Sequence, residues 1–166
     1  LLPTYDVFDE DRYFEPGRGG EIFTIAGRQV GVPICEDIWT QEYLPRPLYD
    51  RELVRGLVEK GAELIVNLSA SPFGLRKLGA RREMVGAIAR AHERPIVYCN
   101  VVGGNDQLVF DGSSIAFNRA GDLIAQLPSF QTAEAIVETD ATAAVALAPF
   151  DPSAELYGAL PFGSPD

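Results

Sequence analysis

The sharpest local feature of the sequence is GVPICEDIW at residues 31–39, where an apolar strand leads directly into a cysteine followed by two carboxylates. A cysteine at the turn from a strand into a helix is exposed at the sheet edge, where the first N–H groups of the helix can lower the pKa of its thiol. A nucleophilic site needs such a thiolate, and Cys35 is the candidate. From spacing alone, an ordinary buried cysteine at a strand end is an equally good interpretation of Cys35.

Strands and helices alternate on either side of this stretch. Amphipathic patterns predict one helix at residues 51–60, with Gly61 as its termination signal, and another at residues 79–93, which ends before Pro95. The turn at residues 119–122 predicts a hairpin between the two strands beside it. We therefore expect an α/β domain with a mixed sheet; a two-sheet sandwich also fits, and periodicity does not decide between them. Strands are expected at residues 21–25, 29–34, 64–68, 95–102, 107–110, 114–118, 123–126 and 135–138.

Composition places the chain among globular proteins and excludes some partners. The 166 residues are 46% hydrophobic and 23% charged, with a net charge of −10. Because nucleic acids and anionic membranes attract basic surfaces, we expect neither as a partner. No apolar run approaches the roughly 18 residues of a membrane span, and residues 1–6 lack the pattern of a signal peptide. Two cysteines make no disulfide framework, so a cytoplasmic protein is expected.

Few other residues are candidates for a catalytic base or a metal ligand beside Cys35. The single histidine, His92, falls near the end of a helix rich in Arg and Glu, where a surface position is expected rather than a catalytic base. A base for Cys35 would then be a carboxylate or an amine. One histidine cannot build a His-rich site, so no metal is expected. The carboxylates in residues 9–15 are expected to form a solvated acidic loop, and Cys99, flanked by apolar residues, is expected in the core.

Two further segments could line a ligand site. Residues 67–73 (NLSASPF) place small polar groups after a predicted strand, where α/β proteins bind ligands, although ordinary turn chemistry is the alternative. Lys77, Arg81 and Arg82 follow, and they either hold a substrate carboxylate or form an exposed basic face. The glycine-rich residues 102–114 have no GxxxxGK(S/T) pattern, which favours a substrate-lining turn or hairpin loop over a phosphate cradle.

Four stretches, taken together and in order, resemble one known family. They resemble the glutaminase domain of glutamine-dependent NAD⁺ synthetases, within the nitrilase or carbon–nitrogen hydrolase superfamily, over about residues 2–126. One such block would be weak, whereas four in the same order are specific. The stretches are residues 2–17 (LPTYDVFDEDRYFEPG), residues 31–39, residues 67–73 with Lys77 and Arg81, and residues 100–112 (NVVGGNDQLVFDG).

This resemblance implies a fold and an organisation. The family folds as an αββα sandwich, so residues 1–140 are expected to form the C-terminal part of the hydrolase domain. Residues 141–166, rich in Ala and Pro, are expected to form a tail or linker toward a synthetase domain of the same protein. That domain's SGGxDS phosphate loop is missing here, so ATP and Mg²⁺ are expected outside this chain, which needs no cofactor of its own. Family members form homo-oligomers, and one is expected here.

The resemblance also implies the chemistry. The family hydrolyses the side-chain amide of glutamine with a Glu–Lys–Cys triad, in which Cys35 matches the nucleophile and the backbone N–H of Glu36 would donate to the oxyanion. Glu10 matches a second glutamate that supports the triad, although Glu15 lies close enough to compete. Glutamine brings an α-ammonium and an α-carboxylate, for which Glu36 and either Arg81 or Lys77 are available. The residues implied at or near the glutamine pocket are Tyr5, Glu36, Ser69, Ser71, Phe73, Lys77 and Arg81.

Departures from the family pattern limit what the chain is expected to do. The family's catalytic lysine would fall immediately before Leu1 and its general-base glutamate earlier still, so neither is within these residues. Without them we predict an inactive isolated chain, because a lost base alone costs roughly 10² to 10⁴ in rate. Thr4, Asn105 and Gln107 stand where Asn, Gln and Glu are usual. The alternatives are a stand-alone nitrilase-type amidase, which the third and fourth stretches argue against, and a catalytically silent assembly piece.

Overall fold

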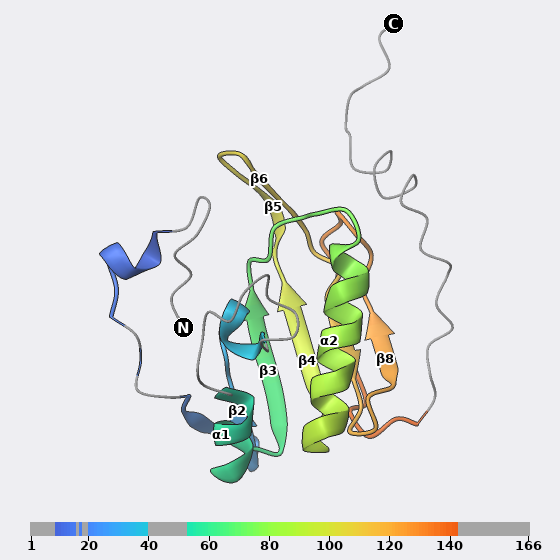
Figure 1. Ribbon diagram of the computed structural model, residues 1–166. Helices are drawn as coiled ribbons and strands as arrows, with labels where there is room; N and C mark the ends of the chain where they lie inside the picture. The colour runs from blue at the N-terminus through green and yellow to red at the C-terminus, as the bar shows by residue number, and fades with distance from the viewer. Residues whose placement is uncertain (1–8, 16, 18–19, 40–52, 143–166) are drawn as a thin grey trace, which may run out of the picture.

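A six-stranded mixed sheet organises the molecule. The computed structural model describes residues 9–15, 17, 20–39 and 53–142, and its main sheet has the order β1-β2-β3-β4-β7-β8 (Figure 1). The pairs β2–β3 and β3–β4 are parallel, and the other neighbours are antiparallel. The strands are β1 (Ile22–Ile25), β2 (Arg28–Gly31), β3 (Leu64–Ser69), β4 (Ile96–Asn100), β7 (Ile115–Phe117) and β8 (Leu123–Gln126).

A second, two-stranded sheet projects beyond the end of β4 (Figure 1). It is the antiparallel hairpin of β5 (Val102–Asn105) and β6 (Leu108–Asp111). Only Val101 separates β4 from β5, and the Gly112 N–H donates to the Val101 carbonyl at 3.0 Å. The hairpin thus returns to the main sheet close to where it left, which places Asp111 near the carboxyl ends of the parallel strands.

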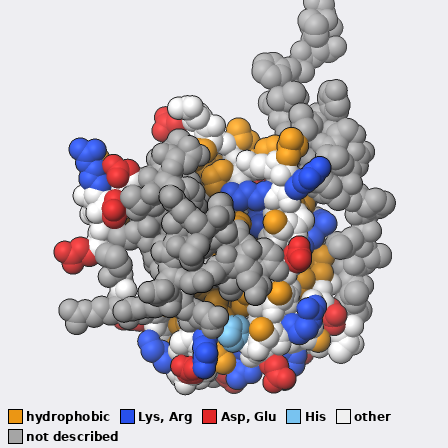
Figure 2. Space-filling model, in the orientation of Figure 1, with side chains coloured by type: hydrophobic (Ala, Val, Ile, Leu, Met, Phe, Trp, Pro, Cys, Tyr) orange, Lys and Arg blue, Asp and Glu red, His pale blue; other side chains and the backbone are white. Residues whose placement is uncertain are grey.

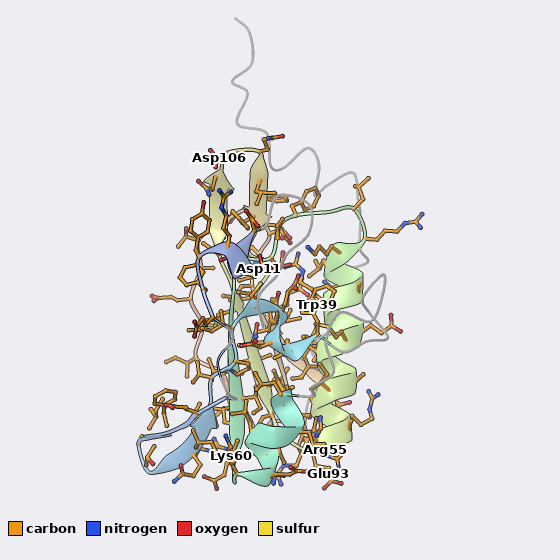
Figure 3. All side chains as sticks on the ribbon, turned by 60° about the vertical axis from the view of Figure 1, so that its left-hand side comes forward. Asp11, Trp39, Arg55, Lys60, Glu93 and Asp106 are labelled. Atoms are coloured by element: carbon orange, nitrogen blue, oxygen red, sulfur yellow. The ribbon has the colours of Figure 1, made fainter. Side chains whose placement is uncertain are left out.

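Two helices cover one face of the main sheet (Figures 1 and 3). They are α1 (Leu53–Glu59) and α2 (Lys77–His92). Leu57 of α1 and Met84 of α2 join Ile65 of β3 and Ile96 of β4 in one buried core. The opposite face of the sheet carries exposed apolar side chains such as Leu68, which is 49% exposed. A sheet with one apolar face left open is suited to packing against a second layer.

Two short 3-10 helices complete the described elements, η1 (Glu10–Arg12) and η2 (Cys35–Ile38). η2 follows β2 after a three-residue connection and lies over the end of β3. Arg76, with a φ of +67°, precedes the first residue of α2, and the Lys77 N–H donates to the Gly74 carbonyl at 3.0 Å. η2 and the start of α2 therefore both lie near the strand ends.

Three predicted strands need correction. Residues 95–102 are divided between β4 and β5, and the glycine-rich residues from Val102 onward form the β5–β6 hairpin, which agrees with the hairpin alternative. The strand expected at residues 29–34 ends at Gly31, because beyond it only Ile34 pairs, as an isolated bridge with Leu68. Residues 135–138 form no strand, since no strand of the described chain pairs with them and Ile136 is fully exposed.

The remaining expectations mostly agree with the structure. The helix predicted at 51–60 is present as α1 within the described residues, and the helix predicted at 79–93 is α2, which begins two residues earlier. The turn at 119–122 does join β7 and β8 as a hairpin. Cys99 is not a core residue, because it alternates with buried Tyr98 and points to the open face of the sheet. Residues 143–166, most of the predicted tail, lie outside the described residues.

Candidate active site at the carboxyl ends of the parallel strands

Cys35 occupies a strained turn at the end of β2. It is the first residue of η2 and has a φ of +47°, in the left-handed region that costs a residue with a side chain free energy. The turn is held on its amino-terminal side, where the Ile34 N–H donates to the Asp37 carboxylate at 2.9 Å. The Cys35 side chain is half-buried. A strained, partly exposed cysteine between a strand and a helical turn matches the predicted nucleophile position.

Asn67, a fully buried residue of β3, holds the Cys35 turn in place through its side-chain amide. Its Nδ2 donates to the carbonyl of Cys35 at 3.2 Å and lies 3.4 Å from the carbonyl of Pro33. Its Oδ1 accepts a hydrogen bond of 2.8 Å from the hydroxyl of Ser69. The Asn67 side chain thus links the nucleophile turn to the end of β3.

Asn100 plays the corresponding part at the end of β4, where it pairs in register with Ser69. Its Oδ1 accepts from the Ser71 N–H at 2.8 Å, and its Nδ2 donates to the Gly112 carbonyl at 3.0 Å and the Ser71 carbonyl at 3.3 Å. Asn100 therefore joins the loop after β3 to the return of the β5–β6 hairpin.

Lys77 brings a positive charge to the same strand ends. It is half-buried, and its Nζ lies 5.9 Å from the centroid of the Trp39 ring, which Figure 3 shows between η2 and α2. Burial lowers the pKa of Lys77, and the neighbouring Arg81 guanidinium lowers it further. Cys35 and Glu36 oppose that shift, which places both of them within electrostatic reach of the Lys77 ammonium.

Arg81, one turn further along α2, is engaged by a carboxylate. Its Nη2 donates to Asp111 Oδ1 at 2.6 Å, and its Nη1 donates to the Gly112 carbonyl at 3.3 Å. The side chains of Arg81 and Asp111 are each 1% exposed. The third nitrogen of the guanidinium, Nε, is buried without a hydrogen bond. Of the two cations predicted for a substrate carboxylate, Lys77 is the accessible one, and a direct contact from Arg81 stays a prediction.

Tyr98 lies beneath the same cluster. Its ring is completely buried, and its hydroxyl has no hydrogen bond of good geometry. Burial raises the pKa of Tyr98, while Ser69, Arg81 and Ser71 act in the opposite direction. These influences place the phenol among the serines and the guanidinium of the site.

The structure brings most of the predicted site residues together at one edge of the sheet. Figure 2 shows Lys and Arg atoms gathered over the amino-terminal half of α2, beside hydrophobic side chains. Phe73 lies near the β5–β6 hairpin, with its N–H donating to the Val109 carbonyl at 2.7 Å and its ring packed edge-on against Phe130. Glu10 is in η1, which Figure 1 shows set apart from these strand ends, so its role stays a prediction. Tyr5 lies outside the described residues.

Sequence analysis missed the buried polar residues that hold the site together. Asn67 and Asn100 interrupt apolar strands near the carboxyl ends of β3 and β4, two positions apart in register, and amides inside apolar runs were the available signal. Asp111 ends the apolar run of β6, where a carboxylate is expensive to bury unless it is paired. Within the described ranges, no helix is long and apolar enough to cross a membrane. Nor does that part of the chain hold a cluster of three or more His, Cys, Asp or Glu side chains that could bind a metal ion.

Comparison with known proteins places this geometry in context. The family model described as carbon-nitrogen hydrolase matches residues 2–148. A glutamine-dependent NAD(+) synthetase from Synechocystis is 39% identical over 100% of this chain and 31% of its own length. A protein of the same name from Thermotoga maritima is 41% identical over 74% of the chain and 20% of its own length. The chain thus spans less than a third of these relatives.

Solved structures give the same picture. Glutamine-dependent NAD+ synthetase from Acinetobacter baumannii, in complex with ADP, matches 79% of this chain and 23% of its own, with a TM-score of 0.69 and 37% identity. A carbon-nitrogen hydrolase from Helicobacter pylori matches 77% of this chain and 46% of its own, with a TM-score of 0.65 and 25% identity. An amidase from Nesterenkonia sp. AN1, 25% identical with a TM-score of 0.59, has been solved with the acetamide moiety of fluoroacetamide added at its active-site cysteine.

Proposed function

Given that this chain belongs to the carbon–nitrogen hydrolase family, we propose that it is the nucleophile-bearing part of a glutaminase that supplies ammonia for NAD⁺ synthesis. The predicted α/β fold, the αββα sandwich of the nitrilase superfamily, is confirmed by the family match and the solved structures. One observation carries the proposal: Cys35 lies on a strained turn at the strand ends, within electrostatic reach of Lys77. Relatives at 36–43% identity that carry the name glutamine-dependent NAD(+) synthetase supply the substrate class.

The proposed reaction proceeds through a thioester. The Cys35 thiolate attacks the side-chain amide carbon of glutamine, so that a C–S bond forms and the amide oxygen becomes an oxyanion. The backbone N–H of Glu36, the residue after the nucleophile, is proposed to donate to that oxyanion. As the oxyanion collapses, the C–N bond breaks and the nitrogen leaves with a proton as ammonia. Water then attacks the thioester, the C–S bond breaks, and glutamate leaves with the thiol restored.

Glutamine itself sets the charges that the pocket must offer. In this proposal the Lys77 ammonium binds the α-carboxylate of glutamine. The Glu36 carboxylate binds the α-ammonium. The glutamate base that activates the thiol and the lysine of the triad are proposed to come from the segment that precedes this stretch in the family. The isolated 166 residues are accordingly proposed to bind glutamine poorly and to turn it over slowly or not at all.

The wider assignment follows from the same resemblance. No SGGxDS phosphate loop occurs in these 166 residues, so the ligase step, with ATP and Mg²⁺, is proposed to take place in a synthetase domain of the same protein. That domain would receive the ammonia and use it to amidate deamido-NAD⁺. A homo-oligomer and a cytoplasmic location are proposed on the same basis.

An electrophilic analogue of glutamine tests the nucleophile directly. The complete polypeptide that contains this sequence is incubated with a diazoketone analogue of glutamine, and the adduct is measured by intact mass and located by peptide mapping. We expect a single adduct on Cys35 that excess glutamine prevents. The matched controls are Cys35→Ala, which should take up no label, and Cys99→Ala, which should react like the unaltered protein because Cys99 faces away from the site.

Three other outcomes would redirect the assignment. Labelling of Cys99 rather than Cys35 would mean that the nucleophile has been misidentified. Labelling of Cys35 that simple amides prevent and glutamine does not would favour a stand-alone amidase. No adduct on a well-folded complete polypeptide would favour a catalytically silent assembly role.

A further inference from the structure

We propose that Asp111 is a positioning residue that acts through Arg81: it holds the Arg81 guanidinium and offsets its charge, so that Lys77, rather than Arg81, presents a cation to the bound substrate. The proposal deepens the proposed glutaminase site and rests on it for the identity of the substrate carboxylate. It assigns a function to a buried carboxylate that the nucleophile, the oxyanion donor and the substrate contacts leave unused.

The close spacing of Lys77 and Arg81 makes their positive charges repel each other, and Asp111 offsets the charge of Arg81. Lys77 and Arg81 are four residues apart on α2, so their side chains occupy the same face on adjacent turns. Two positive charges so close together repel each other, and because Arg81 is buried and Lys77 half-buried, water screens that repulsion less than at the surface. An uncompensated guanidinium would therefore favour loss of the proton from Lys77.

The contacts of Asp111 are suited to that task. Both of its oxygens accept from the same guanidinium nitrogen of Arg81, and the side chains of both residues are 1% exposed. A second guanidinium nitrogen donates to the Gly112 carbonyl, so Arg81 is anchored on the β5–β6 hairpin and not free to turn toward the nucleophile. Lys77, which is only half-buried and contacts the Trp39 ring, is left to face the site.

In the part of the chain that the structure describes, the charged groups around Lys77 come from three elements. Arg81 belongs to its own helix, Cys35 and Glu36 come from η2, and Asp111 comes from β6. Among the described residues, Arg81 is the group that opposes the protonated form of Lys77 by charge, and Asp111 is the acidic partner of that guanidinium. Removing the carboxylate alone should therefore ease deprotonation of Lys77, whereas removing both partners should make deprotonation harder.

The test follows the titration of Lys77 in the complete polypeptide without relying on turnover. Lysines are competitively acetylated with acetic anhydride across a pH series, and the labelling of the Lys77 peptide gives its apparent pKa. In Asp111→Asn we expect that apparent pKa to fall by about half a unit or more relative to the unaltered protein. In Arg81→Gln/Asp111→Asn, which has no buried charge left at this pair, we expect it to rise above that of the unaltered protein.

A matched control separates this effect from a general change in charge. Asp140→Asn removes the carboxylate of the exposed Arg119–Asp140 pair, beyond the opposite end of α2 from Lys77. That substitution should leave the Lys77 titration unchanged. Glutamine kinetics on the same proteins should show a KM that rises at a lower pH in Asp111→Asn, with a smaller change in kcat.

The outcomes are separable. Unchanged Lys77 titration in a folded Asp111→Asn protein would overturn the proposal, and so would a shift in the same direction in the single and double variants. If Asp111→Asn fails to fold, the double variant alone decides, because an unshifted Lys77 titration there contradicts the role of the pair. If the unaltered protein releases no ammonia from glutamine, the glutaminase proposal fails while the Lys77 titrations still show whether Asp111 offsets Arg81.

Discussion

Arg81 and Asp111 form a buried ion pair that joins α2 to the β5–β6 hairpin. Arg81 Nη2 donates to both carboxylate oxygens of Asp111, at 2.6 Å to Oδ1, and both side chains are 1% exposed. Such a pair is expensive to desolvate, and its presence is best explained by what it arranges rather than by the stability it adds. It connects the helix that carries Lys77 to the return of the hairpin that Asn100 also binds.

Breaking this pair from one side should be costly. In Arg81→Met the Asp111 carboxylate remains buried without its partner, and we expect the free energy of unfolding to fall by about 3–5 kcal/mol. In Arg81→Met/Asp111→Leu both charges are gone and apolar volume replaces them, so the loss should be much smaller. Denaturant titration of the two variants beside the unaltered protein measures both effects. Equal losses in the single and double variants would show that packing, rather than the unpaired charge, is responsible.

Asn67 should matter for the nucleophile more than for binding. Asn67→Ala removes the donor to the Cys35 carbonyl, and the strained turn at φ +47° should relax and misplace the thiol. We expect kcat for glutamine hydrolysis to fall by about 10²-fold with little change in KM, since misplacement of about 1 Å costs that much.

A second buried asparagine gives the control. Asn118→Ala removes a side chain that binds Asp122 and the turn between β7 and β8, at the other end of the sheet. It should lower the melting temperature while leaving kcat near that of the unaltered protein. If Asn67→Ala and Asn118→Ala lose stability alike and both keep full kcat, Asn67 has only a structural role.

Gly112 occupies a position that requires glycine. Its φ is +63°, and a Cβ there would overlap the Val102 side chain. We expect Gly112→Ala to lower the free energy of unfolding by about 2–4 kcal/mol, from the left-handed backbone and from overpacking together. Gly27→Ala is the matched control: its φ is +79° but nothing lies within 4 Å of the added Cβ, so only the backbone cost of about 1–2 kcal/mol applies. Equal losses at the two positions would mean that the Val102 contact relaxes freely.

Local patterns in the sequence predicted the main helices and strands, because periodicity and turn signals depend on residues that are close together in the chain. Both helices and the β7–β8 hairpin follow from such patterns, whereas the strand before Cys35 ends at Gly31, earlier than predicted. Side-chain contacts between residues far apart in the sequence do not follow from local patterns. The contact of Arg81 with Asp111 joins residues 30 apart, and no local pattern marks either as a partner of the other. Apolar flanks likewise made Cys99 look like a core residue, because sequence does not show which face of a strand is covered.

The candidate site was predicted as a set of residue types more than as an arrangement. The resemblance pointed to Cys35, Glu36 and the serines at and just after the end of β3, and the structure places these residues near neighbouring strand ends. Their proposed roles in catalysis and binding stay predictions. The strand predicted at residues 135–138 failed for a related reason: an apolar run forms a strand only where another strand is available to pair with it.

The pH dependence of glutamine binding should report on Lys77. Burial, and then Arg81, lower the pKa of Lys77 below its ordinary 10.5, so the cation that holds the α-carboxylate is lost at a lower pH than for an exposed lysine. We expect KM to rise as pH increases through that lowered pKa. In Lys77→Arg the charge persists, and KM should stay flat over the same range.

The stability of the folded protein should change with the opposite sign. Since Lys77 binds its proton less tightly when folded than when unfolded, its contribution to the free energy of unfolding increases with pH between the lowered pKa and 10.5. Denaturant titrations of the unaltered protein and Lys77→Met over a series of increasing pH up to 10.5 should therefore diverge in favour of the unaltered protein. The free energies of unfolding of the unaltered protein and Lys77→Met could instead change with pH in parallel, and KM could rise equally in the unaltered protein and Lys77→Arg. Together, these two results would show that a group other than Lys77 controls the rise of KM at high pH.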